Sequence, residues 1–225
     1  MKAKGQKRVA EEFTSPVIHH ETQPSEQDEL LLQRQRLLQE EAQSVLKELN
    51  VIELLSAGGL VRQTGSTVLG LMVWRDIDLQ VLSPGLSIER AFEIMHPLLT
   101  HPYIKQVRYL HQSDHFKLAD LDERYFFMVY YERPGQAEWK LDISFWLGEG
   151  GHSEPLHDAI AQQLTPETRL TILRIKEVWY QLPTYRVEVI STDIYDAVLQ
   201  HGVRTLTEFD QYLVERGKPP RAQRP

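Results

Sequence analysis

The stretch 62–82, RQTGSTVLGLMVWRDIDLQVL, constrains the fold of this chain most, because it places a turn of small residues before a strand with two carboxylates. These carboxylates belong to Asp76 and Asp78. Side chains of an extended strand alternate between its two faces, so residues two apart point the same way. Positions 77, 79 and 81 are apolar, as in a buried strand. The two carboxylates are therefore predicted to converge on one face.

Two carboxylates held this close repel each other, and either a raised pKa or a bound divalent cation relieves the repulsion. Ligand sets made only of oxygen favour Mg²⁺ or Mn²⁺. Upstream, Gly65 has no Cβ and Ser66 has a hydroxyl, so main-chain N–H groups of this turn can approach phosphate oxygens closely. Either fragment alone is more often an ordinary turn or surface strand, but together they predict a metal and a phosphate in one site.

A third carboxylate, Asp142, lies in the run 139–147, WKLDISFWL, where polar and apolar residues alternate as in a strand. An unpaired carboxylate buried among apolar neighbours is costly, so Asp142 needs a partner. A metal shared with Asp76 and Asp78 is one candidate. A salt bridge to an arginine is the other.

The sequence Gly65-Ser66, the pair Asp76 and Asp78, and the later Asp142 resemble the motif pattern of the DNA polymerase beta-type nucleotidyltransferase superfamily. Its small bacterial members resemble this chain most, namely the antibiotic nucleotidyltransferases and the minimal nucleotidyltransferases of toxin–antitoxin pairs. The resemblance covers the region from about residue 60 to residue 147. Many relatives place a serine directly before the acidic pair, whereas this chain has an arginine there, preceded by a tryptophan.

The resemblance implies transfer of a nucleoside monophosphate from a nucleoside triphosphate, such as ATP, to a hydroxyl of a small molecule or protein, with release of pyrophosphate. It implies that Asp76, Asp78 and Asp142 are the catalytic residues and the ligands of Mg²⁺ or Mn²⁺. It also implies that Gly65 and Ser66 bind the nucleotide through its triphosphate.

The amino-acid composition limits the kinds of molecule that this protein could bind. The chain has 32 acidic and 25 basic residues, so its net charge of −7 leaves no broad basic surface for the phosphates of a nucleic acid. A small-molecule or protein acceptor is therefore favoured over nucleic acid. The absence of cysteine excludes disulfides and thiolate zinc sites and fits a reducing compartment. No apolar run reaches membrane-spanning length and no signal-peptide core is present, so the prediction is a cytoplasmic protein without a membrane partner.

The remaining patterns predict an α/β (α+β) fold, with a nucleotidyltransferase-type mixed β-sheet flanked by helices and a C-terminal helical subdomain. A helix begins near Ser25 and Asp28, which have capping-box spacing, and ends near Asn50. The apolar segment 51–61 contains two glycines and predicts a strand or a broken connection. A further helix follows Ser87. Strands are predicted over three runs, of which the last two form a hairpin: 103–111, 124–132 and 139–147.

A glycine-rich segment at 148–151 predicts a flexible link into the helical part. Three helices are predicted there: one starting at Thr165 and Pro166, one over 191–201 and one from Thr205 to Gly217. The predicted organisation is a mobile tail, an α/β core, a helical subdomain and a second tail, over residues 1–27, 28–147, 148–217 and 218–225.

Several other residues are weaker candidates. His111 and His115 have the spacing of a helical metal pair but lie at a strand end and in a linker, so a ligand role is not favoured. The aromatic run 124–131 predicts core packing first, although Tyr130 or Tyr131 could face a nucleotide. Four C-terminal cations could face a cleft, although helical cations usually form a solvated face, and Lys176 is weakly favoured among them: Arg169, Arg174, Lys176 and Arg186.

Two other functions remain open. Glycosyltransferases also use Asp-x-Asp to hold manganese, but they need a dinucleotide-type βαβ unit before the acidic pair, and only a helix and a short apolar segment precede it here. The other alternative is a degenerate nucleotidyltransferase fold that binds a nucleotide or a protein without catalysis. The presence of all three acids argues against this alternative, whereas Arg75 in the loop keeps it open.

Overall fold

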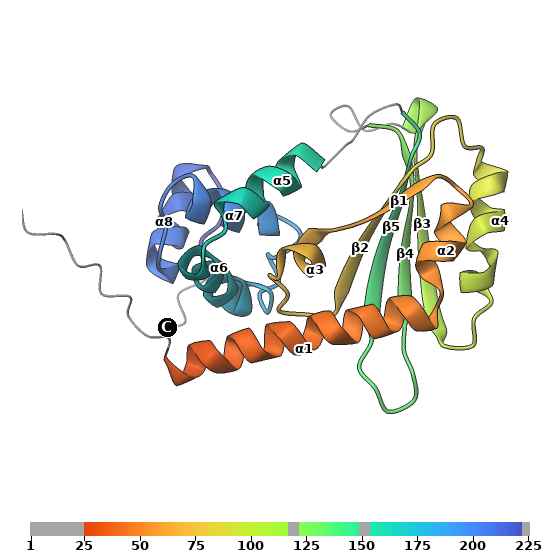
Figure 1. The fold of residues 1–225 in the computed structure, drawn as a ribbon. Helices are drawn as coiled ribbons and strands as arrows, with labels where there is room; N and C mark the ends of the chain where they lie inside the picture. Colours follow the sequence, from red (N-terminus) through yellow and green to blue (C-terminus); the bar gives the residue numbers. More distant parts are fainter. Residues whose placement is uncertain (1–24, 117–121, 149–153, 222–225) are drawn as a thin grey trace, which may run out of the picture.

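A five-stranded mixed sheet forms the centre of the computed structural model, which describes residues 25–116, 122–148 and 154–221 (Figure 1). In spatial order its strands are β1 (Leu60–Thr64), β2 (Asp76–Leu82), β5 (Trp139–Trp146), β4 (Arg124–Tyr131) and β3 (Ile104–Gln112). Strands β2 and β5 run parallel, and every other neighbouring pair is antiparallel. The predicted mixed sheet and the β4–β5 hairpin are confirmed.

Helices flank this sheet and make up the described C-terminal region. The N-terminal ones are α1 (Glu26–Glu48), α2 (Val51–Ser56), α3 (Gly65–Leu69) and α4 (Ile88–Leu99), and a 3₁₀ turn covers Asp114–Phe116. The C-terminal ones are α5 (Glu154–Gln163), α6 (Pro166–Trp179), α7 (Ser191–Leu199) and α8 (Leu206–Glu215). None of the helices in the described ranges is long and apolar enough to cross a membrane.

The alternation of each central strand separates the two faces of the sheet. One face is apolar, and α2 and α4 cover it on the side turned away from the C-terminal helices (Figure 1). Ile77, Ile143 and Phe127 belong to this face and are fully buried. Each such side chain stabilises the fold by about 1.5–3 kcal/mol. The opposite face carries the polar residues of β2 and β5, so it is the face available for a site.

The C-terminal helices have a hydrophobic core of their own. Trp179, Ile194 and Phe209 are fully buried in this second core, which also receives Leu71 and Val73 from the segment between α3 and β2. The segment that precedes the acidic strand is therefore anchored in the helical part. This anchoring fixes where the first acidic residue of β2 lies relative to α6 and α7.

Helix α1 also contacts both parts, running past the sheet and the C-terminal helices (Figure 1). Its buried residues Ala42 and Val45 pack in the core of the sheet. Its first turns reach α6 through two ion pairs. Nε of Arg174 in α6 donates to Asp28 of α1 at 2.7 Å, and Arg34 of α1 pairs with Glu177 of α6 at 2.5 Å. The glycine-rich link at 148–151 lies almost wholly outside the described residues, and a division of the chain at 148 stays a prediction.

Some local predictions differ from the structure. Helix α1 begins directly after Ser25, so residues 26 and 27 are helical, whereas the rest of the predicted tail, residues 1–24, lies outside the described residues. The segment predicted as a strand or broken connection starts with the short helix α2, because Val51 and Leu55 are one helical turn apart and bury the same face. The strand β1 then begins only at Leu60.

Two further differences concern the C-terminal region. The prediction of three helices omitted α5, so the described part contains four. Residues 218–221 were assigned to a tail, yet Lys218 donates to Asp193 at 2.6 Å and Arg221 pairs with Asp210 at 2.7 Å. These contacts attach the segment to α7 and α8.

The start of α1 generates a stability prediction. Asp28 is buried, accepts from the Ser25 N–H at 2.9 Å to complete a capping box, and accepts two hydrogen bonds from Arg174, which hold the pKa of Asp28 well below its usual range. Asp28→Ala should lower the free energy of unfolding by about 2 kcal/mol, measured by urea denaturation. Glu29→Ala, an exposed acid of the same turn, is the control and should have a much smaller effect. Equal effects of the two substitutions would contradict this role of Asp28.

Candidate active site

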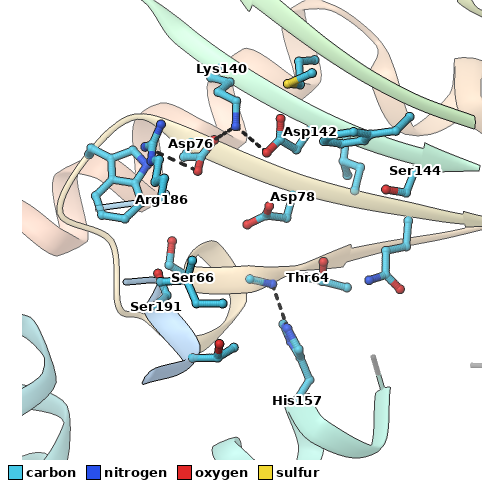
Figure 2. A pocket seen from close by; sticks show the side chains of 18 of the residues that line it. Thr64, Ser66, Asp76, Asp78, Lys140, Asp142, Ser144, His157, Arg186 and Ser191 are labelled. Carbon is cyan, nitrogen blue, oxygen red and sulfur yellow. Dashed lines mark hydrogen bonds and ion pairs between the residues drawn. The ribbon is translucent and has the colours of Figure 1, made fainter. Parts of the chain in front are cut away.

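The three predicted aspartates meet on the polar face of the sheet (Figure 2). Asp78 of β2 lies directly opposite Asp142 of β5 in the parallel register, and Asp76 lies two residues earlier on β2. One carboxylate oxygen from each residue lies within 4.8 Å of the other two. The strand alternation inferred from the sequence thus brings the acids together, and the parallel pairing of β2 with β5 supplies the third.

Their proximity changes the protonation equilibria of these acids. Loss of solvation and the charges of Asp76 and Asp142 raise the pKa of Asp78 above its usual range. Burial and the charge of Asp76 likewise raise the pKa of Asp142. Desolvation disfavours the charged form of a carboxylate, and a like charge nearby adds to that effect. A cation at this position would stabilise all three acids in their ionised form.

Two cationic side chains already contact the acids. The Lys140 ammonium donates to Asp142 and lies 3.5 Å from Asp76 Oδ1, because Lys140 precedes Asp142 by two residues on the same face of β5. Arg186, from the loop between α6 and α7, lies 3.8 Å from Asp76 Oδ2. Burial opposes the charge on Lys140, but Asp76 and Asp142 outweigh it and raise the pKa of Lys140. The sequence predicted an arginine as the alternative partner of Asp142, but the observed partner is this lysine.

The donor set fits a magnesium or manganese ion. All three groups offer oxygen, which both metals prefer. Asp142 Oδ1 is buried and has no hydrogen-bond partner, although its other oxygen binds Lys140. A buried carboxylate oxygen without a partner is energetically costly, and coordination to a metal would remove that cost.

The Gly65 turn lies directly against Asp78. Gly65 directly follows β1 and begins α3, with φ of +72°, a conformation that L side chains rarely adopt. A Cβ at this position would lie 1.9 Å from Asp78 Oδ2. Only glycine allows this close approach. The Gly65 N–H donates to Nε2 of His157 from α5 at 3.1 Å (Figure 2). Ser66 follows as a buried residue.

A cavity of about 540 Å³ contains the three acids and the Gly65 turn. The sheet and the C-terminal helices both line it, so neither part forms the site alone. Strand β4 contributes Arg124, Phe126 and Met128. The C-terminal region contributes Arg186, one of the cations named from the sequence, and four residues that sequence reasoning missed: His157, Tyr185, Ser191 and Tyr195.

Some of the cavity residues could have been predicted from a sequence pattern, and others could not. Strand β4 alternates, and its core face consists of Tyr125, Phe127, Val129 and Tyr131, so the other face could have been assigned to the polar side of the sheet. Residues from α5 and the α6–α7 loop carry no such signal, because only tertiary packing brings them to the cavity.

Four weaker candidates lie elsewhere. Tyr131 is buried in the core and donates its hydroxyl to Glu48 at 2.8 Å, so it does not face a nucleotide. Tyr130 does not line the cavity. His111 hydrogen-bonds to a serine hydroxyl, and neither His111 nor His115 joins a metal-ligating cluster within the described ranges.

Two cations near the acidic strand do not line the cavity. Arg75 pairs with Glu41 of α1 at 3.0 Å, so it does not enter the site. Lys176 is fully buried and donates to the Leu71 carbonyl at 2.7 Å and to the Tyr195 hydroxyl at 3.2 Å. Burial lowers the pKa of Lys176 to about 7, although Asp78 and Asp76 oppose the change. The prediction that Lys176 faces a cleft is therefore wrong, and the lysine lies behind Tyr195.

The Gly65 geometry generates a matched pair of substitutions. Gly65→Ala imposes both an unfavourable φ and a clash with Asp78, whereas Gly85→Ala imposes only the unfavourable φ of +70°, since nothing lies within 4 Å of its Cβ position. We expect Gly85→Ala to cost about 1–2 kcal/mol in urea denaturation and Gly65→Ala to cost more. Gly65→Ala should also weaken the stabilisation by Mg²⁺, because it displaces Asp78. Identical behaviour of the two variants would show that the close approach is unimportant.

The contact of His157 generates a pH prediction. Burial lowers the pKa of His157 below the ordinary value of a histidine, with Asp158 opposing, and only unprotonated Nε2 accepts from the Gly65 N–H. The contribution of His157 to stability is therefore complete above the unfolded-state pKa and falls as the pH decreases below it. Between about pH 8 and pH 5.5 the melting temperature should fall less in His157→Gln, which accepts without titrating, than in wild type. His96→Gln, at an exposed histidine, should follow the wild-type curve. A fall in His157→Gln as large as in wild type would contradict the assignment.

Comparisons with known proteins bear on the fold. No protein-family model matches this chain, and no curated protein matches it. A crystal structure of Cid1 poly(U) polymerase bound to MgATP matches with a TM-score of 0.53 and 16% identity, over 80% of this chain and 56% of that chain. This chain therefore spans little more than half the length of that protein.

Two further solved structures show weaker likeness. A cytoplasmic RNA terminal U-transferase matches with a TM-score of 0.39 and 14% identity, over 66% of this chain and 46% of that chain. CdnC from E. coli MS115-1, determined with ATP, matches with a TM-score of 0.43 and 16% identity, over 85% of this chain and 67% of that chain. With its mixed sheet, its acids on β2 and β5 and its likeness to Cid1, this chain has the fold of the DNA polymerase beta-type nucleotidyltransferases.

Proposed function

We propose that this protein is a metal-dependent nucleotidyltransferase that moves a nucleoside monophosphate from a nucleoside triphosphate to a hydroxyl of a small molecule or protein. The observation that carries this proposal is the convergence of Asp76, Asp78 and Asp142 on one face of the sheet, directly against the Gly65 turn. This arrangement joins a site for divalent cations to a backbone turn that can approach phosphate. The fold, shared with a poly(U) polymerase, supports the proposal.

Asp76, Asp78 and Asp142 would hold Mg²⁺ or Mn²⁺, which when bound would neutralise the triphosphate and stabilise the charge on the departing pyrophosphate. The chain itself positions the substrates. Gly65 and Ser66 would present their N–H groups to phosphate oxygens, and an oxygen bound at Gly65 would replace His157 Nε2 as the acceptor. Arg186, beside Asp76, would add positive charge at the same end of the cavity.

The transfer forms one bond and breaks one. The acceptor oxygen bonds to the α-phosphorus, the bond from that phosphorus to the bridging oxygen breaks, and pyrophosphate leaves with the electron pair. The hydroxyl proton would pass to Asp142, whose Oδ1 has no hydrogen-bond partner and can therefore accept it. Displacement of the Lys140 ammonium from Asp142 would further free this carboxylate.

One observation favours a second function. Lys140 already bridges Asp142 and Asp76, and such a bridge would also be present in a non-catalytic fold that binds a nucleotide or a protein. In that case Lys140 and Asp142 would be partners in stability. The glycosyltransferase alternative has no comparable support, because the acidic strand β2 follows an antiparallel strand rather than a dinucleotide-type βαβ unit.

The test combines metal binding with transfer. Mg²⁺ should raise the wild-type melting temperature, since saturation at one hundred times the dissociation constant stabilises a protein by about 2.7 kcal/mol. Asp142→Asn is nearly isosteric, so it should leave the fold intact, weaken the Mg²⁺ effect and reduce transfer of label from [α-³²P]NTPs by more than about 100-fold. Transfer is scored on a panel of hydroxyl acceptors with Mg²⁺ or Mn²⁺.

Lys140→Met separates the two functions. In an enzyme it should leave Mg²⁺ binding intact or strengthen it, because it removes a cation that competes for Asp142. In a non-catalytic fold Asp142→Asn and Lys140→Met should lower stability alike, with no Mg²⁺ effect and no transfer. That pattern would refute the enzymatic proposal.

A further inference from the structure

Arg124 is a cation of the cavity that the proposed chemistry does not use. It begins strand β4 and lines the cavity, and two neutral side chains fix its guanidinium. Nε donates to Gln112 Oε1 at 2.6 Å, and Nη1 donates to Ser144 Oγ at 3.0 Å. No carboxylate in the described part of the chain forms an ion pair with it. The remaining N–H groups of this guanidinium can thus donate to solvent or to a ligand.

Two aromatic rings hold the same guanidinium. Its Cζ lies 4.4 Å from the ring centre of Phe126 and 4.9 Å from that of Trp146, which faces Arg124 across the β4–β5 pair. Such cation–π contacts orient a planar guanidinium without neutralising its charge. The orientation of the Arg124 guanidinium is therefore fixed before a ligand binds.

The charge of Arg124 is poorly compensated. Burial lowers the pKa of Arg124, and the only opposing influence is the charge of Asp142. Arg124 is partly buried, where a cation without a paired anion is destabilised, and Asp142 is already engaged by Lys140. An anionic ligand group beside Arg124 would remove this cost and form charge-assisted hydrogen bonds.

The position of Arg124 indicates which substrate would supply that group. The Gly65 turn directly follows β1 at one edge of the sheet, whereas Arg124 belongs to β4, on the far side of β5. The guanidinium reaches Ser144, which follows Asp142 by two residues on the same face of β5. It therefore lies on the side of Asp142 away from the proposed triphosphate site. An acceptor whose hydroxyl lies at Asp142 would extend toward Arg124.

We propose that Arg124, bracketed by Phe126 and Trp146, binds an anionic group of the acceptor, which is a small molecule that carries a carboxylate or another oxyanion besides its hydroxyl. The inference rests on the proposed nucleotidyl transfer and specifies the class of acceptor. Phe126 and Met128 line the cavity between Arg124 and the acids, so an apolar body between hydroxyl and anion fits. A cavity of about 540 Å³ has the size of a small-molecule site.

The test uses three probes with one scaffold. 4-Hydroxyphenylacetate carries a carboxylate, 4-hydroxybenzylphosphonate another oxyanion, and 4-hydroxyphenylacetamide no charge. Isothermal titration without nucleotide should show that wild type binds the anionic probes about tenfold more tightly than the amide. In Arg124→Gln this preference should fall to about twofold or less, whereas Arg124→Lys should keep part of it because the charge remains. Arg90→Gln, at an exposed arginine paired with Glu93, should behave as wild type.

The outcomes separate this inference from the proposed function. Anion preference that depends on Arg124, without transfer to any acceptor, would support the anion site and refute the enzymatic proposal. Transfer to hydroxyl acceptors without anion preference, or with a preference unchanged in Arg124→Gln, would refute the anion site alone. Transfer to the end of oligo(U) that is unaffected by Arg124→Gln would also overturn it, in favour of a nucleic-acid acceptor. A lower melting temperature of Arg124→Gln with unchanged probe selectivity would make Arg124 a structural residue only.

Discussion

The mutual repulsion of three carboxylates is the constraint on which the rest of this structure depends. Asp78 and Asp142 face each other across two parallel strands, and Asp76 adds a third charge within the same 4.8 Å group. The fold compensates this charge from two directions, through Lys140 on the sheet and Arg186 from the C-terminal loop. Such a concentration of like charge is stable only with cations nearby, so the arrangement favours a site that binds metal and phosphate over a purely structural one.

The loop between α6 and α7 contributes a cation, Arg186, to the site. Arg186 has φ of +68°, a conformation unfavourable for a residue with a side chain, and its guanidinium lies 4.5 Å from the ring centre of Trp74. Trp74 in turn stacks on Tyr180 and meets Tyr185 edge to face. Backbone strain of this kind persists only where surrounding contacts enforce it, and it is common at functional sites. The aromatic cluster therefore holds a second cation next to Asp76, in addition to Lys140 of the sheet.

The cavity divides into two chemical environments along the sheet. At the β1 edge the Gly65 turn offers a backbone N–H, accepted by His157, and no Cβ could be accommodated between the turn and Asp78. Beyond β5 the surface becomes aromatic, with Arg124 between Phe126 and Trp146. The acids lie between these environments. In the proposed reaction, these two environments would let the phosphate donor and the acceptor approach the acids from opposite sides.

The sequence by itself determined the local features. Each capping box, at Ser25, Thr165 or Thr205, lies within four consecutive residues, so these helix starts could be predicted. The alternation around Asp76, Asp78 and Asp142 follows from strand geometry, so the acidic face could be predicted as well. Only the tertiary structure decided the rest. His157 reaches a turn 92 residues earlier in the chain, and Lys176 is enclosed behind Tyr195. These contacts depend on how the helical part packs against the sheet, and a local pattern of residues carries no information about such packing.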